Sequence, residues 1–281
     1  MGKTESMTFL LLIVLAVLPL ASQSVPSDAE QGLPEGWIHA PSSKANPALW
    51  DCAGRGRSWV ISDRGGAVAI KALNVDEEVG VVVPPQLKLT KEMVGRRHLL
   101  RTSDGWLIGF DAGEFGGGLW WFSEDGTDSK KLLSNNVHAI YATQNSTFVL
   151  AGLAHLGLDS GEVDQFIETP DRVTLRWVAN LGGSPEASTV GRDGQIVVAS
   201  PRGVVRVDNE GKVHTIYRSG EHLTYPTSIV VNENDDIFVA MRFFILRLRP
   251  VDSAYRPEWL MPKSCRSFKT VRYVCSCTAT D

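Results

Sequence analysis

Residues Ile196–Val207 read IVVASPRGVVRV and follow the polar turn Arg192-Asp-Gly194. Two short apolar runs, rich in β-branched residues, flank the interruption Ser200-Pro-Arg-Gly203. β-Branched residues favour strands, and Asp-Gly or a Gly-containing interruption between apolar runs is typical of hairpins. The stretch therefore predicts two antiparallel strands joined by a short loop, with a second turn directly before them.

The same pattern occurs five times along the chain. The second strand of each repeat begins at an apolar anchor, and neighbouring anchors lie 41 to 48 residues apart: Trp59, Trp106, Phe148, Ile196 and Ile237. Polar turns precede four of the anchors: Ser103-Asp-Gly105, Gln144-Asn-Ser146, Arg192-Asp-Gly194 and Asn232–Asp236. An internal repeat of this period indicates a fold built from similar supersecondary units.

A fourth strand closes most repeats, for example Lys212–Tyr217. Four antiparallel strands per repeat, without a helical period, are typical of β-propeller blades. We predict an all-β chain with a single β-propeller of four-stranded antiparallel blades, five in number, or six if the terminal segments complete another. The five blades cover about residues 47–87, 98–134, 137–180, 185–217 and 226–262. A β-sandwich is the main alternative, but its strands need not repeat in one internal order.

The N-terminus has the features of a cleavable secretory signal peptide over residues 1–24. Lys3 precedes the apolar run Phe9–Leu20, and small residues follow it. The run is shorter than the roughly 20 residues of a membrane-spanning helix. We expect a secreted or periplasmic protein without a stable membrane span after cleavage, and an uncleaved anchor is the alternative. Residues 25–46 form a lead-in segment, 47–262 the propeller domain and 263–281 a cysteine-containing tail.

The chain has four cysteines, of which three lie in the tail. Export makes disulfides possible, and Cys265 bonded to Cys275 or Cys277 is the predicted bridge. Cys275-Ser-Cys277 lacks the two-residue spacer and the second ligand pair of a zinc site. We expect no metal and no cofactor. Asn145-Ser-Thr147 is a glycosylation sequon on a predicted turn.

Two segments resemble known propeller blades. Ala187–Asp208, with its Asp-Gly turn and late Gly-x-x-Arg strand, resembles a blade of the two-component-regulator propellers. Pro226–Ala240 is similar to a blade of NHL or gluconolactonase-like propellers. Gluconolactonase-like propellers hold a metal with Glu, Asn and Asp at the starts of inner strands, where this chain has only Glu186. The resemblance therefore implies a fold and carries no catalytic signature.

In a propeller, the loops from second to third strands and the loops between blades lie on one rim, which usually carries ligands. Ala154–Gly161 is expected to be a longer loop than its counterparts there. The glycine-rich stretch Asp111–Gly118 leads into a strand, so the helix N-terminus on which a phosphate loop relies is absent. The ligand-binding candidates on this rim are Asp111, Glu114, His138, His155, Asp159, Glu186, His222 and Tyr225.

The leading hypothesis is a propeller that binds a small molecule, glycan or protein partner through this rim, without dedicated catalysis. The chain lacks the Gly-x-Ser-x-Gly, His-Glu-x-x-His and Walker motifs. A hydrolase or lactonase that uses Asp111, Glu114, His138, His155 and Glu186 is the alternative. A third reading is an envelope assembly scaffold, since residues 242–272 carry eight basic and two acidic side chains. Export and a net charge of −4 disfavour nucleic-acid binding, and we expect a monomer.

Overall fold

The structure is a computed structural model that describes residues 33–40, 58–64, 67–73, 80–220, 223, 225–242 and 244–263. The predicted signal peptide, all four cysteines and His222 lie outside the described residues. Among the described residues, no helix is long and apolar enough to cross a lipid bilayer. The regular secondary structure of the described residues consists of β-strands and one short 3₁₀ helix, η4 (Gly113–Phe115).

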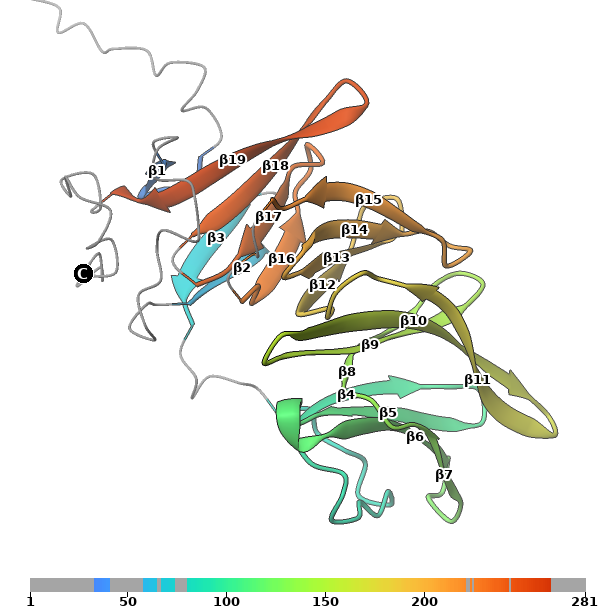
Figure 1. Cartoon of the computed structure of the whole chain (residues 1–281). Coiled ribbons are helices and arrows are strands. Elements are labelled where there is room, and N and C mark those ends of the chain that lie inside the picture. The colour runs from blue at the N-terminus through green and yellow to red at the C-terminus, as the bar shows by residue number, and fades with distance from the viewer. Residues whose placement is uncertain are drawn as a thin grey trace, which may run out of the picture. The chain divides into compact units, whose positions relative to one another are not determined.

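Five antiparallel sheets, named blades 1 to 5 in chain order, contain the described strands (Figure 1). Blade 1 consists of β2 (Trp59–Arg64) and β3 (Ala67–Ala72). Blade 2 consists of β4 (Arg96–Arg101), β5 (Gly105–Asp111), β6 (Gly117–Ser123) and β7 (Ser129–Leu133). Blade 3 consists of β8 (Val137–Ala142), β9 (Thr147–His155), β10 (Leu158–Thr169) and β11 (Arg172–Asn180).

Blade 4 consists of β12 (Ala187–Val190), β13 (Ile196–Ser200), β14 (Gly203–Val207) and β15 (Val213–Arg218). Blade 5 consists of β16 (Ser228–Val231), β17 (Ile237–Ala240), β18 (Ile245–Val251) and β19 (Ala254–Pro262), with β1 (Trp37–His39) beside β19. In blades 2 to 5 the strands pair in chain order, as the repeat predicts. The protein is an all-β propeller with five blades in its described part.

Apolar side chains between neighbouring sheets hold the blades together. Separate buried clusters join blades 2 and 3, blades 3 and 4, blades 4 and 5, and blades 5 and 1. Every residue of β13 and β17 is buried, because a second strand is covered on both faces by adjacent blades. This position explains their uninterrupted apolar runs, whereas the outer strand β15 is half exposed.

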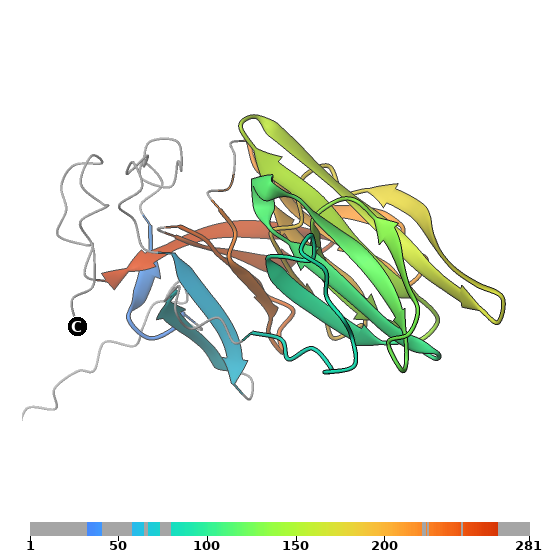
Figure 2. The same ribbon diagram turned by 90° about the horizontal axis from the view of Figure 1, so that it is seen from below.

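The two ends of the repeat array lie side by side, and the C-terminal bound of blade 1 differs from the expectation. Blade 1 packs beside blade 5 through contacts of β2 with β16 and β17 (Figure 2). Residues 80–87, predicted to belong to blade 1, form no strand. Instead, Leu87 and Met93 pack on Ile108 and Trp120 and cover one face of blade 2. These apolar side chains are therefore buried although their segment forms no strand. An apolar pattern alone does not distinguish such a segment from a strand.

The lead-in segment contributes a strand to the last blade. Trp37, Ile38 and His39 pair antiparallel with residues 260–262 of β19. The Trp37 ring meets Trp59 of blade 1 edge-on, with a centroid separation of 5.0 Å. The N-terminal strand thus contacts both blade 5 and blade 1. The domain boundaries at residues 47 and 262 stay predictions.

The loop expected to be long at Ala154–Gly161 is short, and its flanking strands are long. β9 and β10 continue to Leu156 and Gly157, which form the turn with φ values of 45° and 88°. Two successive residues with positive φ are the signature of a tight type I′ hairpin. Leu156 is 92% exposed at the tip. The absence of Asn or Asp at the turn hid this hairpin from a sequence-based reading.

The basic segment, residues 242–272, has part of its positive charge neutralised by carboxylates within blade 5. Arg247 is only 4% exposed and donates from Nε to Asp236 Oδ2 at 3.0 Å. Arg249 and Arg256 lie 3.4 and 2.9 Å from Glu258 Oε1. Arg247 is therefore buried inside blade 5 and does not lie on its solvent face. Residues 264–272 lie outside the described residues.

Candidate functional site

One rim of the propeller brings together polar residues from blades 2, 3 and 4. They come from the end of β5, the start of β8, the start of β10 and the connection between β11 and β12. These are the second-to-third strand loops and the inter-blade loops that topology assigns to one rim. The group formed by Asp111, His138, Asp159, Ser184 and Glu186 is called the rim cluster below.

His138 stands at the centre of the rim cluster because a β-bulge displaces it from the ladder. The pairing of β8 with β9 shifts between Val137 and Ala139, so His138 has no partner residue. A bulge re-aims the extra side chain. The ring places Nδ1 3.6 Å from Asp111 Oδ2. Its Nε2 lies 3.2 Å from the carbonyl oxygen of Gly152 and 3.4 Å from Ser184 Oγ.

Asp111 is held by the glycine-rich loop that follows it. The Gly113 amide donates to Asp111 Oδ1 at 3.0 Å. The amides of Ala112, Phe115 and Gly116 donate within the loop, to the carbonyls of Gly116, Ala112 and Gly113. No row of free amides therefore points outward from this loop, which agrees with the rejection of a phosphate loop. The loop instead fixes the Asp111 carboxylate toward blade 3.

Asp159 anchors the connection that carries Ser184 and Glu186. Its side chain is 6% exposed and accepts from the Ser184 amide at 2.7 Å and from Arg202 Nε at 2.8 Å. A Cβ on Gly183 would lie 3.1 Å from Asp159 Oδ1, so this tight approach favours glycine. Asp159 thus ties blade 3 to blade 4 and is a positioning residue more than an open ligand contact.

Glu186 is the carboxylate whose pKa the rim cluster changes. Burial raises the pKa of Glu186. The charge on His138 and a hydrogen bond with Ser184 lower this pKa, whereas the negative charges of Asp111 and Asp159 raise it further. Burial of a carboxylate disfavours its charged form. Glu186 therefore carries its proton at a higher pH than a carboxylate in water.

His98 belongs to the same neighbourhood, although it was not among the candidates. It is the third residue of the inner strand β4, and His138 is the second residue of the inner strand β8. Burial lowers the pKa of His98 to about 4, helped by the charges of Arg96 and His138 and opposed by Asp111. Its Nε2 is buried and has no hydrogen-bond partner among the described residues. The shared position at the start of an inner strand was the signal that could have identified it.

Glu114 and His155 form a separate pair on the same rim. His155 Nε2 lies 2.9 Å from Glu114 Oε2, and the side chains are 36% and 46% exposed. The pair joins η4 of blade 2 to the end of β9 of blade 3. It is more open to solvent than the rim cluster, so salt screens it more strongly.

The contact of Tyr225 differs from those of the other candidates, because its ring partner is Arg242. It precedes blade 5 with φ of 51°, is 62% exposed and stacks under the Arg242 guanidinium at 4.2 Å. His222 lies outside the described residues. Of the eight candidates, Asp111, His138, Asp159 and Glu186 therefore gather, Glu114 and His155 pair, and Tyr225 contributes a stacked ring.

Within the part of the chain that the structure describes, no group of three His, Cys, Asp or Glu side chains is arranged to hold a metal ion. Within the rim cluster, one oxygen of Asp159 accepts a hydrogen bond from Arg202, and one oxygen of Asp111 accepts a hydrogen bond from the Gly113 amide. The acceptor groups that remain are suited to hydrogen-bond donors.

Asp164 is a buried carboxylate between blades 2 and 3. It is 4% exposed, and its Oδ2 has no hydrogen-bond partner among the described residues. Burial, and then the charge of Glu162, raise the pKa of Asp164 to about 6. The folded state therefore binds this proton more tightly than the unfolded state, and stability is lost as pH rises from about 4 through 6.

Asp164→Asn is expected to raise the free energy of unfolding by about 1–2 kcal/mol at pH 7.5 and to change it little at pH 4. Asparagine removes the cost of a buried charge and keeps the side-chain shape. Urea unfolding at both pH values measures the difference. Asp171→Asn, at the exposed β10–β11 turn, is the control. Equal effects of Asp164→Asn at the two pH values would contradict the assignment.

No protein-family model matches the chain, and no curated protein is similar to it. Among solved structures, a streptogramin B lyase is similar with 13% identity and a TM-score of 0.40, over 61% of this chain and 56% of the lyase. A gluconolactonase of Xanthomonas campestris is similar with 12% identity and a TM-score of 0.38, over 69% and 65% of the two chains.

The extracellular domain of a hybrid two-component system of Bacteroides thetaiotaomicron has 13% identity and a TM-score of 0.34, over 74% of this chain and 25% of that one. This chain thus spans little more than half of the lyase and a quarter of the two-component protein. The fold assignment rests on the sheets themselves. The resemblance to NHL and two-component-regulator blades in particular stays a prediction.

Proposed function

We propose that the protein is an exported propeller that binds a small polar ligand through the rim cluster, without dedicated catalysis. The observation that carries the proposal is the convergence of Asp111, His138 and Glu186 from blade 2, blade 3 and the connection to blade 4. Sites built from several blades put polar groups from distant parts of the sequence around one point. Such convergence on a rigid scaffold is typical of ligand sites.

The chemistry of the rim cluster favours a ligand that offers hydrogen-bond donors. The Gly152 carbonyl and the carboxylates of Asp111 and Glu186 are acceptors, and His138 lies among them. Because Glu186 has a raised pKa, a ligand with a cationic or donor group would favour its charged form. Binding is therefore expected to release a proton from Glu186 near its pKa.

A panel of primary amines, hydroxy acids and short peptides tests the proposal by thermal denaturation of the purified protein. At least one compound is expected to raise Tm with concentration, since binding to the folded state alone stabilises it. His138→Ala and Glu186→Gln are expected to abolish the rise. Glu210→Gln, on an exposed turn of blade 4, is the matched control and is expected to retain it. A rise that survives both rim variants would contradict the proposal.

The hydrolase alternative is favoured by one observation, the position of His138 between the Asp111 carboxylate and the Ser184 hydroxyl. Ser184 is completely buried, so its oxygen is not open to attack on a substrate. A hydrolase at this rim would instead rely on Glu186 as a general acid, for which a raised pKa is suited. Turnover of a lactone, ester or glycoside that Glu186→Gln abolishes would support this alternative against binding alone.

The remaining expectations are part of the proposal. Export rests on residues 1–24 and the tail disulfide on Cys265, Cys275 and Cys277, all outside the described residues. A scaffold role for the basic segment stays a prediction; three of its arginines already contact Asp236 or Glu258. A monomeric state also stays a prediction, which sedimentation of the purified protein would test.

A further inference from the structure

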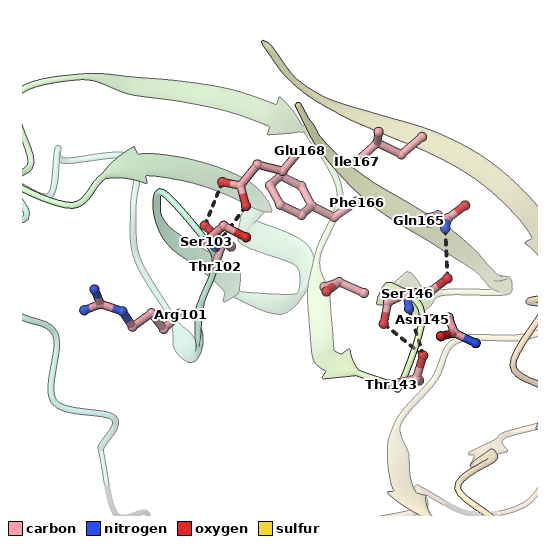
Figure 3. A pocket seen from close by; sticks show the side chains of 11 residues that line it. Arg101, Thr102, Ser103, Thr143, Asn145, Ser146, Gln165, Phe166, Ile167 and Glu168 are labelled. Carbon is pink, nitrogen blue, oxygen red and sulfur yellow. Dashed lines mark hydrogen bonds between the residues drawn. The ribbon is translucent and has the colours of Figure 1, made fainter. Parts of the chain in front are cut away.

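A polar groove of about 480 Å³ lies at the seam of blades 2 and 3 (Figure 3). Its lining comes from the β4–β5 turn, the β8–β9 turn and the C-terminal half of β10. These are first-to-second strand turns, and antiparallel strands place them on the rim opposite the rim cluster. The groove is called the hydroxyl groove below. Its volume is within the range of ligand pockets, roughly 300–1,000 Å³.

A network of hydrogen bonds holds the walls of the hydroxyl groove. Glu168 accepts from Thr102 Oγ1 at 2.9 Å and from the Ser103 amide at 3.0 Å, and so ties blade 3 to blade 2. On the other wall, Gln165 donates to Ser146 Oγ at 2.9 Å. Figure 3 shows both ties, with Glu168 pointing to the Thr102–Ser103 turn and Gln165 to the facing turn. The frame is therefore preorganised without a ligand.

The two charged side chains that line the hydroxyl groove, Glu168 and Arg101, already have partners within the protein. Both oxygens of Glu168 accept hydrogen bonds from the β4–β5 turn. Arg101 forms an ion pair with Glu124 and stacks on Trp106 with its guanidinium carbon 5.2 Å from the ring centroid. The groups left to a ligand are therefore mainly neutral.

Three side chains in the hydroxyl groove make no hydrogen bond to another described residue: Ser103 through its hydroxyl, Asn145 through its amide and Thr147 through its hydroxyl. Each of these groups both donates and accepts. Sugar hydroxyls have the same dual character, whereas a charged ligand would have to displace Glu168 or Arg101 from its present partners. We propose that the hydroxyl groove binds a short neutral saccharide.

Titration calorimetry with maltose, cellobiose, lactose and N,N′-diacetylchitobiose tests the proposal on the full chain. Glucuronate and glucosamine serve as charged comparisons. At least one neutral disaccharide is expected to bind saturably and more tightly than either charged sugar. Because a glycan on Asn145 would fill the hydroxyl groove, the protein is produced in a host that does not glycosylate its sequon.

Thr147→Val, Asn145→Ala and Ser103→Ala are each expected to weaken the binding about fivefold, the effect of one net hydrogen bond. Valine keeps the β-branched shape in β9, and Ser103→Ala keeps the backbone amide that bonds Glu168. Thr215→Val and Asn209→Ala, exposed on blade 4, are the matched controls and are expected to bind normally.

His138→Ala separates this proposal from the proposed function, since it changes the opposite rim and is expected to leave saccharide binding intact. Three results would overturn the proposal. They are the absence of binding by every neutral saccharide, preference for a charged one, and affinities that the three groove variants leave unchanged.

Discussion

Asp236→Ala is expected to lower the free energy of unfolding by about 3–5 kcal/mol, enough to unfold a marginally stable propeller. Asp236 and Arg247 are each 4% exposed, and Arg247 donates to Asp236 from both Nε and Nη2. Removal of the carboxylate leaves a buried guanidinium whose remaining acidic neighbour, Glu258, lies 3.7 Å away. A buried charge without close compensation is more costly than the pair is stabilising.

Chemical unfolding followed by tryptophan fluorescence measures this loss. Glu233→Ala, an exposed position in the same turn, is expected to change the free energy of unfolding by less than about 0.5 kcal/mol. The double variant Asp236→Ala with Arg247→Met removes both charges and is expected to recover much of the loss. If the double variant is as unstable as the single one, packing and not an unpaired charge is the cause.

Acid is expected to destabilise the protein through His98. Its pKa is lowered to about 4 by burial, so the unfolded state binds this proton more tightly than the folded state. A histidine whose pKa is lowered by folding stabilises the protein fully above its pKa in the unfolded state, near 6.5. This stabilisation is lost as pH falls toward 4. The contribution lost over this window is about 3 kcal/mol.

His98→Gln removes the titrating ring, and its free energy of unfolding is expected to fall less steeply between pH 7 and pH 4.5 than that of the unaltered protein. Asp164 acts with the opposite sign over nearly the same window, since a raised carboxylate pKa relieves a cost as pH falls. The double variant His98→Gln with Asp164→Asn therefore separates the two contributions. Thr215→Val, at an exposed position of β15, removes no titrating group and is the control. An unchanged slope in His98→Gln would contradict the assignment.

The repeat pattern predicted blades 2 to 5 closely because it is local. A buried second strand must be apolar on both faces, and Ile196–Ser200 and Ile237–Ala240 show this directly. The extra strand of blade 5 was less visible, since Trp37–His39 pairs with residues more than two hundred positions away. The segment around Leu87 and Met93 was misread because apolar residues can cover a sheet without joining it.

The sequence predicted the rim on which the candidate residues lie, but it did not predict the contacts among them. Antiparallel topology alone placed Asp111, His138, Asp159 and Glu186 at the same ends of their blades. Their convergence on His138 depends on the bulge in β8, which the composition of Val137–Ala142 does not signal. The roles of His98 and Ser184 emerged only when burial and neighbours from other blades were known.

Strand periodicity and turn chemistry act between near neighbours in the chain, and they therefore predicted the all-β repeat, the antiparallel blades and the rim on which each polar loop lies. Which carboxylate is buried, which charge is paired and which hydroxyl is open to solvent became known only from the packing of the blades. Those properties depend on desolvation and on distances of a few ångströms between blades, and residues from separate repeats set both.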